Sequence, residues 1–351
     1  MEFLLPGAIS FLVTLLAVSP TIKLAKKFNL IDNPRLRSHP AHTQKRVVPR
    51  AGGLACFIGL AVALLLFLPI SHQLIGIVIG LAILLAVGLW DDKYPNFSPY
   101  FRLFGQFIAA AAVVSSGIGI NFITNPLGGI IQFDSLGIPF LSSLLALLWI
   151  IWVMNMINWS KGVDGQMPSI VTIASIILGL LSLKFTLLGD PSQSNVAKIA
   201  FITAGASFGL LIFNWYPAKI FPGFSGSTIL GFMIAILAIL SGAKLATAIL
   251  VLLIPATDFA YTFFRRILQK KSPVWGDRGH LHHKLIDLGL THQQISLFYA
   301  LGSVILGAIA LSLSSSGKLF AASLIAILIL GTILWLNFFG GLSERRAPDN
   351  G

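Results

Sequence analysis

The sequence predicts an all-α membrane protein, a polytopic bundle of transmembrane helices. Of its 351 residues, 56% are hydrophobic and only 10% are charged, and the mean hydropathy is +0.88. A soluble chain of this length could not bury so much apolar surface. Crossing a bilayer takes roughly 20 apolar residues per helix, and the alternation expected of membrane strands is missing. We therefore expect one membrane domain over residues 1–343, followed by a short cytoplasmic tail, 344–351.

Hydrophobic runs define about eleven spans (10–11) by this length criterion. The first run lacks a basic segment before it and a small-residue cleavage site after it, which predicts an anchor rather than a signal peptide. Residues 226–241 form a short run after a Gly-rich turn, which favours a broken or re-entrant helix there. A single cysteine, Cys56, excludes an intrachain disulfide. The expected spans are 3–22, 51–70, 73–90, 101–118, 138–157, 167–188, 196–213, 226–241, 244–264, 295–313 and 318–340.

Basic residues predict the orientation of these spans. With the N-terminus outside, the inner loops and tail carry 20 of the 24 Lys and Arg residues. The positive-inside rule then places these loops in the cytoplasm of a bacterial-type plasma membrane. The net charge of +12 fits retention of the basic loops on the inner side of the membrane and attraction to anionic lipid headgroups. A few of the cations could instead form a basin for a phosphorylated substrate. Nucleic acid is not expected as a partner, because no soluble basic domain carries the charge.

The residues able to do chemistry fall on this cytoplasmic side, and the other side holds almost none. That asymmetry predicts an enzyme that works on a polar substrate from one face of the membrane, rather than a pore or a scaffold. The residues are Asp91, Asp92, Asn155, Asn158, Asp164, Asn214, His280, His282 and His283.

Asp91 and Asp92 follow an apolar run at an expected helix C-terminus. The helix dipole is negative there, so two adjacent carboxylates need a cation. Their proximity suits a metal site or a proton acceptor. The alternative is a solvated helix end with Lys93 as partner.

Asn155 and Asn158 are three residues apart and share a helix face. Amides in a lipid-facing run are costly and normally face a partner or a cavity, although hydrogen bonds between helices would satisfy them as well. The following loop places Asp164 between glycines, where backbone can approach a ligand closely.

Two later segments carry polar donors. Asn214 leads into a Gly- and Ser-containing helix start that could present N–H groups to phosphate, or be an ordinary turn. The compact cluster His280, His282 and His283, flanked by Arg278 and Lys284, suits contact with phosphate oxygens better than zinc, because no nearby carboxylate or thiolate completes a zinc site. Chance clustering is the alternative.

The first cytoplasmic segment, 23–50, brings Lys45 and Arg50 to the start of the second span. A topological anchor and a site for an anionic lipid headgroup both fit this arrangement.

Taken in order, these strings resemble the polyprenyl-phosphate N-acetylhexosamine-1-phosphate transferase superfamily, over roughly residues 20–300. The compact His-x-His-His form is more similar to the N-acetylglucosamine-1-phosphate branch than to the muramoyl-pentapeptide branch. The matching strings are Asp-x-Pro and Pro-Arg-x-Gly-Gly within 32–53, Gly-Leu-x-Asp-Asp at 88–92, Asn-x-x-Asn and Gly-x-Asp-Gly within 155–165, Phe-Asn-x-x-Pro-Ala at 213–218 and His-x-His-His at 280–283.

The resemblance implies transfer of a sugar 1-phosphate from a UDP-N-acetylhexosamine to a polyprenyl (undecaprenyl) phosphate, with release of UMP, as a first membrane step of cell-envelope glycan synthesis. It implies Mg²⁺, with Mn²⁺ as a substitute, held by Asp91, Asp92 and Asn158. It assigns catalytic roles to Asp91, Asp92, Asp164, His280, His282 and His283. It assigns substrate contacts to Lys45, Arg50, Asn155, Asn158, Lys161, Asn214 and Arg278. Homodimers are common in this family.

Two positions depart from the family pattern. Lys161 stands where the family usually has the first acid of Asp-Gly-x-Asp-Gly, and Phe224 stands where it has a metal-ligating Asp. Fewer anions and an added ammonium weaken the binding of a dication. Two hypotheses follow: Lys161 partly replaces the charge of the metal, or the chain binds its substrates without turning them over.

Three functions are therefore compared. The first is an active transferase. The second is a degenerate relative that binds polyprenyl phosphate or nucleotide-sugar as a regulator or partner subunit. The third, a transporter, is disfavoured because its polar residues should lie near the midplane in a repeated architecture, whereas here they lie at one end and no repeat is visible.

Overall fold

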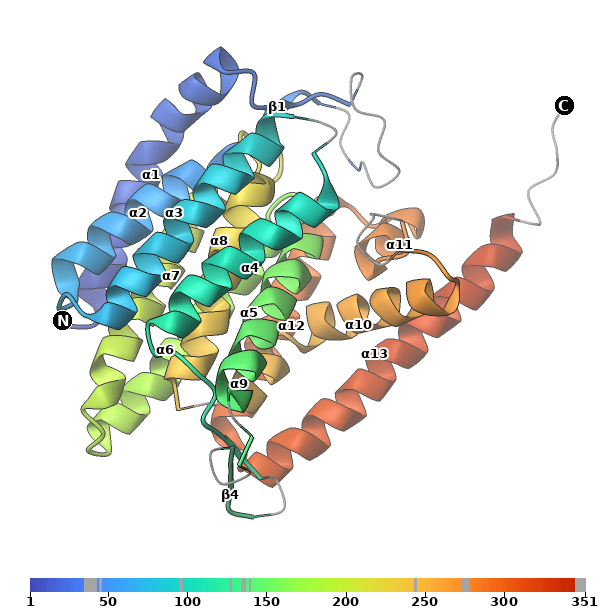
Figure 1. The fold of residues 1–351 in the computed structure, drawn as a ribbon. Coiled ribbons are helices and arrows are strands. Elements are labelled where there is room, and N and C mark those ends of the chain that lie inside the picture. Colours follow the sequence, from blue (N-terminus) through green and yellow to red (C-terminus); the bar gives the residue numbers. More distant parts are fainter. Residues whose placement is uncertain are drawn as a thin grey trace, which may run out of the picture.

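The protein is a bundle of helices with two small two-stranded sheets (Figure 1). The computed structural model describes residues 1–34, 43, 46–94, 97–125, 128–133, 137–138, 140–242, 245–272 and 278–344. The helices are α1 (Leu4–Lys27), α2 (Gly52–Phe67), α3 (His72–Lys93), α4 (Pro99–Ser115), α5 (Leu141–Trp159), α6 (Gln166–Leu187), α7 (Ser192–Asn214), α8 (Gly223–Leu240), α9 (Leu245–Val251), α10 (Leu253–Leu268), α11 (Leu281–Asp287), α12 (His292–Ser312) and α13 (Ser315–Glu344).

The predicted all-α membrane fold is confirmed. Every predicted span coincides with a helix or with a bent pair of helices. Within the described residues, eight helices are long and apolar enough to cross a membrane, or nine if the bent pair counts as one span. The count of about eleven is therefore not confirmed. The difference lies in α2 and α4, which have 16 and 17 residues, and in the bent pair.

Helix α8 forms the centre of the bundle, with 94% of its apolar window buried inside the protein. It packs against α2, α3 and α5. The expectation of a broken or re-entrant helix at 226–241 is wrong, because α8 runs unbroken from Gly223 to Leu240. Its apolar side chains and small residues are enclosed by other helices, so a short span is sufficient there.

The break occurs instead within the predicted span 244–264. Helices α9 and α10 meet at Leu252 with a bend of 85°. In Figure 1, α10 runs sideways across the bundle, and the long helix α13 passes along its outside. Helix α13 packs on α9 and α10, and only 6% of its apolar window is buried.

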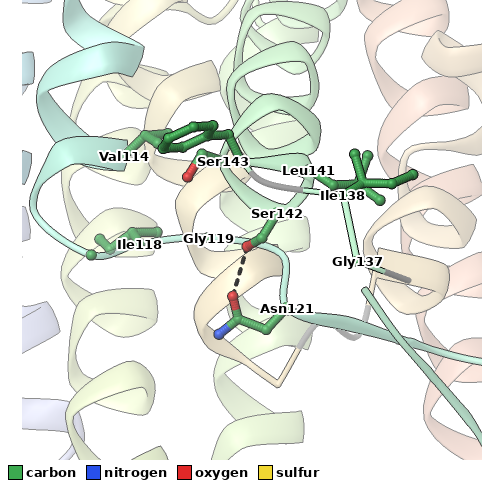
Figure 2. Close-up of a pocket in the computed structure, with 11 residues that line it drawn as sticks. Val114, Ile118, Gly119, Asn121, Gly137, Ile138, Leu141, Ser142 and Ser143 are labelled. Carbon is green, nitrogen blue, oxygen red and sulfur yellow. Dashed lines mark hydrogen bonds between the residues drawn. The ribbon is translucent and has the colours of Figure 1, made fainter. Parts of the chain in front are cut away.

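The two sheets lie at opposite ends of the bundle (Figure 1). One end holds β1 (Ile31–Asp32) paired antiparallel with β2 (Val48–Pro49). The other end holds β3 (Phe122–Thr124) paired antiparallel with β4 (Ile130–Gln132). Near this second sheet, a cavity of about 570 Å³ lies between the end of α4 and the start of α5. Figure 2 shows the Ser142 hydroxyl at its wall donating to Asn121 Oδ1 over 2.6 Å.

Candidate active site

The two acidic residues Asp91 and Asp92 lie at the end of α3, where they are 0% and 2% exposed. The alternative of a solvated helix end is therefore wrong. Buried carboxylates need hydrogen-bond donors or cations around them. Here α8, α4 and the segment after β2 supply these partners.

Asp92 ties the end of α3 to the start of α8. Its Oδ1 accepts the backbone N–H of Phe224 over 2.8 Å, and its Oδ2 accepts the Ser225 hydroxyl over 2.7 Å and the Ser225 N–H over 3.3 Å. A carboxylate is stabilised there because a helix N-terminus carries free N–H groups and a positive dipole. The N–H groups at this helix start are thus used by Asp92 rather than left open for phosphate.

Two arginines neutralise the acidic pair. Arg50 Nε lies 3.0 Å from Asp92 Oδ1, and Arg50 Nη2 lies 3.4 Å from Asp91 Oδ2. Arg102 Nε, from α4, lies 2.5 Å from Asp91 Oδ1. The predicted site residue Arg50 therefore reaches the acids, while Arg102 is an addition that sequence reasoning counted only as a topology signal.

Lys161 lies half-buried in the loop between α5 and α6 and points at the same region. Its ammonium donates to Asn158 Oδ1 over 2.6 Å, to the Gly223 carbonyl over 3.0 Å and to the Ser227 hydroxyl over 3.1 Å. Loss of solvent, together with the nearby Arg50, lowers the pKa of Lys161 to about 7, and the acids Asp92 and Asp91 oppose that shift.

The two predicted asparagines of α5 have different surroundings. Asn158 accepts from Lys161 and from the Ser227 hydroxyl, the latter over 2.8 Å. Asn155 instead pairs with Gln106 of α4, to which its Nδ2 donates over 2.8 Å. The alternative of a hydrogen bond between helices holds for Asn155, and its substrate contact stays a prediction.

Asn214 holds two loops together at this end of the bundle. Its Oδ1 accepts the Gly165 N–H over 3.0 Å, and its Nδ2 donates to the Ile220 carbonyl over 2.9 Å. The amide therefore fixes the glycine loop after α5 against the turn before α8. Both of its polar atoms have protein partners, so its predicted contact with substrate also stays a prediction.

Asp164 lies buried in the glycine loop after α5. Its Oδ2 receives Arg46 Nη2 and the Ala218 N–H, each over 2.9 Å. His292, at the start of α12, has its Nδ1 3.8 Å from the other carboxylate oxygen, and the Ser296 hydroxyl donates to the Asp164 carbonyl. Arg46, just before β2, thus reaches the predicted catalytic loop, and Arg46 and His292 are site neighbours that the sequence did not reveal.

The histidine cluster borders the same loop. The His282 ring packs on Gly162, where an added Cβ would lie 1.9 Å from His282 Nε2. The rings of His280 and His282 are stacked with centroids 5.5 Å apart, and those of His282 and His283 lie 4.3 Å apart. The structure therefore joins the histidines to the loop that carries Lys161 and Asp164.

A buried carboxylate from α10 orients this cluster. Asp258 Oδ2 lies 3.0 Å from His280 Nδ1, and Asp258 Oδ1 accepts the Leu281 N–H over 2.8 Å. The carboxylate that contacts His280 is not one of the acids next to the cluster in the sequence, because the fold brings it from 22 residues upstream. A usable signal was present, because Asp258 is an ionisable residue inside a predicted membrane span.

The other two histidines keep free nitrogens. Among the described residues, His282 Nδ1 and His283 Nδ1 are buried without a hydrogen-bond partner. Burial, reinforced by neighbouring histidines, lowers the pKa of His282 well below its ordinary value and lowers that of His283 to about 4. Both rings are therefore neutral near pH 7, and each can accept or donate one hydrogen bond to a ligand.

Two predicted substrate contacts are not placed at the site by the structure. Arg278 is exposed and pairs with Asp287 over 3.1 Å. Lys45 lies outside the described residues. The remaining predicted residues all come together at one end of the bundle, on the ends of α3, α5, α7, α8 and α11.

The residues expected to hold Mg²⁺ already have partners within the protein. Mg²⁺ prefers oxygen ligands in octahedral geometry, but both oxygens of each acid face guanidinium groups or N–H and O–H donors. Asn158 Oδ1 faces an ammonium. In the part of the chain that the structure describes, no group of three or more His, Cys, Asp or Glu could hold a metal. The residues as arranged do not fit a magnesium ion, and Mg²⁺ stays a prediction.

A helical membrane bundle with acids, bases and imidazoles gathered at one end defines a membrane-embedded enzyme. Residues 74–242 match the model of the glycosyl transferase family 4. The chain is 29% identical over 345 residues to a probable undecaprenyl-phosphate N-acetylglucosaminyl 1-phosphate transferase of Bacillus subtilis, covering 96% of this chain and 92% of that protein. It is also 29% identical over 382 residues to a decaprenyl-phosphate N-acetylglucosaminephosphotransferase of Mycolicibacterium smegmatis, covering 99% and 90%.

An undecaprenyl-phosphate alpha-N-acetylglucosaminyl 1-phosphate transferase of Yersinia pestis is 25% identical over 303 residues, with 82% of this chain and 78% of that protein covered. The chain is thus similar to the glycosyl transferase family 4 over residues 74–242 and to polyprenyl-phosphate N-acetylglucosamine-1-phosphate transferases over most of its length, and it is a transferase of the membrane. The resemblance drawn from the motifs is thereby confirmed.

Proposed function

We propose that this protein transfers N-acetylglucosamine 1-phosphate from UDP-N-acetylglucosamine to a polyprenyl phosphate of the undecaprenyl type and releases UMP. The observation that carries this proposal is the buried acidic pair held between Arg50, Arg102 and Lys161, in a chain similar over nearly its whole length to transferases of this kind. These relatives favour the active transferase over the degenerate binder and the transporter.

The transfer exchanges one bond for another. A phosphate oxygen of the lipid attacks the β-phosphorus of the UDP-sugar, and the bond from that phosphorus to the bridging oxygen breaks. UMP leaves with the bridging oxygen and its electron pair, and the lipid diphosphate-sugar remains. No proton is required if the lipid phosphate enters as a dianion, so the protein must bind, align and neutralise charge.

The residues divide these tasks according to their contacts. Arg50 and Arg102 can turn free N–H groups toward phosphate oxygens while they hold the acids ionised. Asp91, whose two oxygens face Arg50 and Arg102, is the carboxylate suited to keep a proton off the attacking phosphate. The neutral His282 and His283, each with an unpartnered Nδ1, are the residues available to add hydrogen bonds to the departing phosphate.

Its setting is part of the proposal. We place the active end at the cytoplasmic face of a bacterial plasma membrane, because 20 of the 24 basic residues lie in loops of that side under the predicted topology. Formation of a homodimer, expected from the family resemblance, belongs here too, and crosslinking of the protein in membranes tests it.

The test is UMP release by purified protein supplied with UDP-N-acetylglucosamine and undecaprenyl phosphate. Wild type should form UMP and a lipid-linked sugar diphosphate in equal amounts. Asp91→Asn should lower the rate by roughly 10²-fold or more, as expected for removal of a group that handles a proton, and Lys93→Met is a nearby exposed control. Absence of product from wild type with every UDP-N-acetylhexosamine offered would reject the proposal.

A further inference from the structure

Three cationic side chains gather at the acidic pair. Arg50, Arg102 and Lys161 face Asp91 and Asp92, and Asp32 is a third acid that acts on Arg50. Each acid that is paired with an arginine has less negative charge left for a dication, and cations placed this closely attract the phosphates of a ligand.

The ammonium of Lys161 contacts oxygen atoms that could otherwise be ligands of a hard cation. It contacts Asn158 Oδ1, the Gly223 carbonyl and the Ser227 hydroxyl within 3.1 Å. Three oxygen acceptors suit the three N–H donors of an ammonium. Amide and carbonyl oxygens are also ligands of Mg²⁺, so this ammonium and a metal ion would compete for the same place.

Phe224 completes the arrangement. Its ring centroid lies 5.7 Å from Lys161 Nζ and 5.5 Å from the Arg102 guanidinium carbon. The face of an aromatic ring attracts cations at this distance. The ring therefore stabilises two cations at the position where the family pattern has a carboxylate, and Lys161 and Phe224 form a matched pair.

We propose that the ammonium of Lys161, flanked by Arg50 and Arg102, takes the place of a divalent cation, so that this protein binds the diphosphate of its nucleotide-sugar without a metal ion. The inference rests on the proposed function and deepens it, because it assigns the group that holds the diphosphate. Lysine binds phosphate as a point charge. The negative charge of a bound diphosphate favours the charged form of Lys161.

The same ammonium then assists the transfer. As the bond from the β-phosphorus to the bridging oxygen breaks, negative charge builds on the phosphate of the departing UMP. A fixed cation beside that oxygen stabilises the charge. Atoms and electrons balance as in the transfer described above, and neither an oxidant nor a reductant is needed.

The first experiment measures turnover without metal. Wild type in excess EDTA should release UMP at the rate seen with Mg²⁺. Lys161→Met should lose activity by about 10²- to 10³-fold, as expected for removal of a preorganised charge, and Lys161→Arg should restore part of it. Lys219→Met, which removes an exposed lysine at the same end of the bundle, is the matched control.

The outcomes separate the two proposals. Turnover of wild type only with Mg²⁺ would overturn the metal-free site and leave the transferase function standing. Absence of turnover in all conditions would overturn the transferase function, and binding would then decide the inference. UDP-N-acetylglucosamine should raise the unfolding temperature of wild type in EDTA, and stabilisation seen only with Mg²⁺ would refute the inference.

A third measurement does not depend on turnover, and its decisive result comes from wild type. Electron paramagnetic resonance of Mn²⁺ titrated into wild type should show the ion remaining free. The double variant Lys161→Asp, Phe224→Asp restores two acids and should hold one equivalent, which makes it the positive control. One tightly bound Mn²⁺ per wild-type chain would overturn the inference.

Discussion

Residues that look equivalent in the sequence have different partners at the active end, and these partners give them different roles. Asp91 and Asp92 are adjacent, yet Asp92 accepts two N–H groups from α8 whereas Asp91 faces two arginines. Asp258, which belongs to none of the sequence motifs, contacts His280 and accepts the Leu281 N–H at the start of α11. Function at this scale depends on contacts between segments far apart in the chain.

Asp258→Asn should impair the histidine cluster without unfolding the protein. The amide keeps an acceptor for the Leu281 N–H but removes the charge that orients His280. Hydrogen bonds to charged groups contribute about 1.5–3 kcal/mol, which predicts a loss of roughly 10- to 100-fold in UMP release. The unfolding temperature, measured alongside, should change little. A variant as active as wild type would show that the orientation of His280 does not matter.

The low pKa of His283 predicts a loss of stability in acid. An exposed histidine in the unfolded chain titrates near 6.5, whereas burial lowers the pKa of His283 in the fold to about 4. The fold therefore favours the neutral ring, and this stabilisation is complete above pH 6.5 and lost as the pH falls toward 4. The groups that face it are His280, His282, Arg278, Asp287 and Asp258.

Thermal unfolding of wild type and His283→Gln between pH 7.5 and pH 4.5 checks this. The wild-type unfolding temperature should fall more steeply with acid than that of the variant, because the variant has lost one group that takes up a proton on unfolding. Parallel curves would mean that His283 is not held neutral.

At the scale of elements, close contact between helices sets the site. Gly88 of α3 lies against α8 so tightly that an added Cβ would come within 2.3 Å of Ser225 Cα. Gly53 of α2 approaches the same turn, with a Cβ position 2.4 Å from the Gly226 nitrogen. Small residues allow such approach between helices in membranes, and here they bring the end of α3 to the start of α8.

Gly88→Ala should therefore separate α3 from α8. Overpacking of this kind costs about 1–3 kcal/mol, and Asp91 and Asp92 would move with the helix end. We expect a lower unfolding temperature together with reduced UMP release. Gly331→Ala in α13 has open space around its Cβ and should leave both unchanged, so equal behaviour of the two variants would contradict the packing argument.

The sequence predicted most helices because long apolar runs determine spans directly. The sequence suggested a break at 226–241, where α8 is continuous, and not between α9 and α10, where the break occurs. A Gly-rich turn followed by a short apolar run has the same pattern in a broken helix and in a fully enclosed one. The sequence placed Asp91, Asn158, Asp164 and the histidines at one end correctly, since each follows or precedes a span. Pairings such as Asn155 with Gln106 depend on which helices are neighbours, and periodicity within one helix does not contain that information.

At the scale of the whole molecule, one end is polar and reactive and the other is built from β3, β4 and the cavity of Figure 2. Asn121 and Ser142 at that cavity bond to each other, and the site residues Arg102 and Asn158 lie at the far ends of α4 and α5. The chemistry of the chain is therefore confined to one membrane face.

Cysteine labelling can determine which face this is. Cys56 is the only cysteine of the sequence, so Cys56→Ser gives a cysteine-free background. An impermeant maleimide added to intact cells should label Ser192→Cys, at the start of α7, and spare Lys219→Cys until the membrane is permeabilised. The reverse pattern would invert the predicted orientation.

The enclosure of α8 separates the site from the lipid. Membranes differ in thickness, and a helix in contact with acyl chains responds to the mismatch by tilting or shifting. Helix α8 is walled off by its neighbours, whereas α13 presents almost its whole length outward. We therefore expect α13 to adjust more than α8 to a thicker or thinner bilayer, so that the turn that carries Phe224 and Ser225 changes its depth less than the outer helix does.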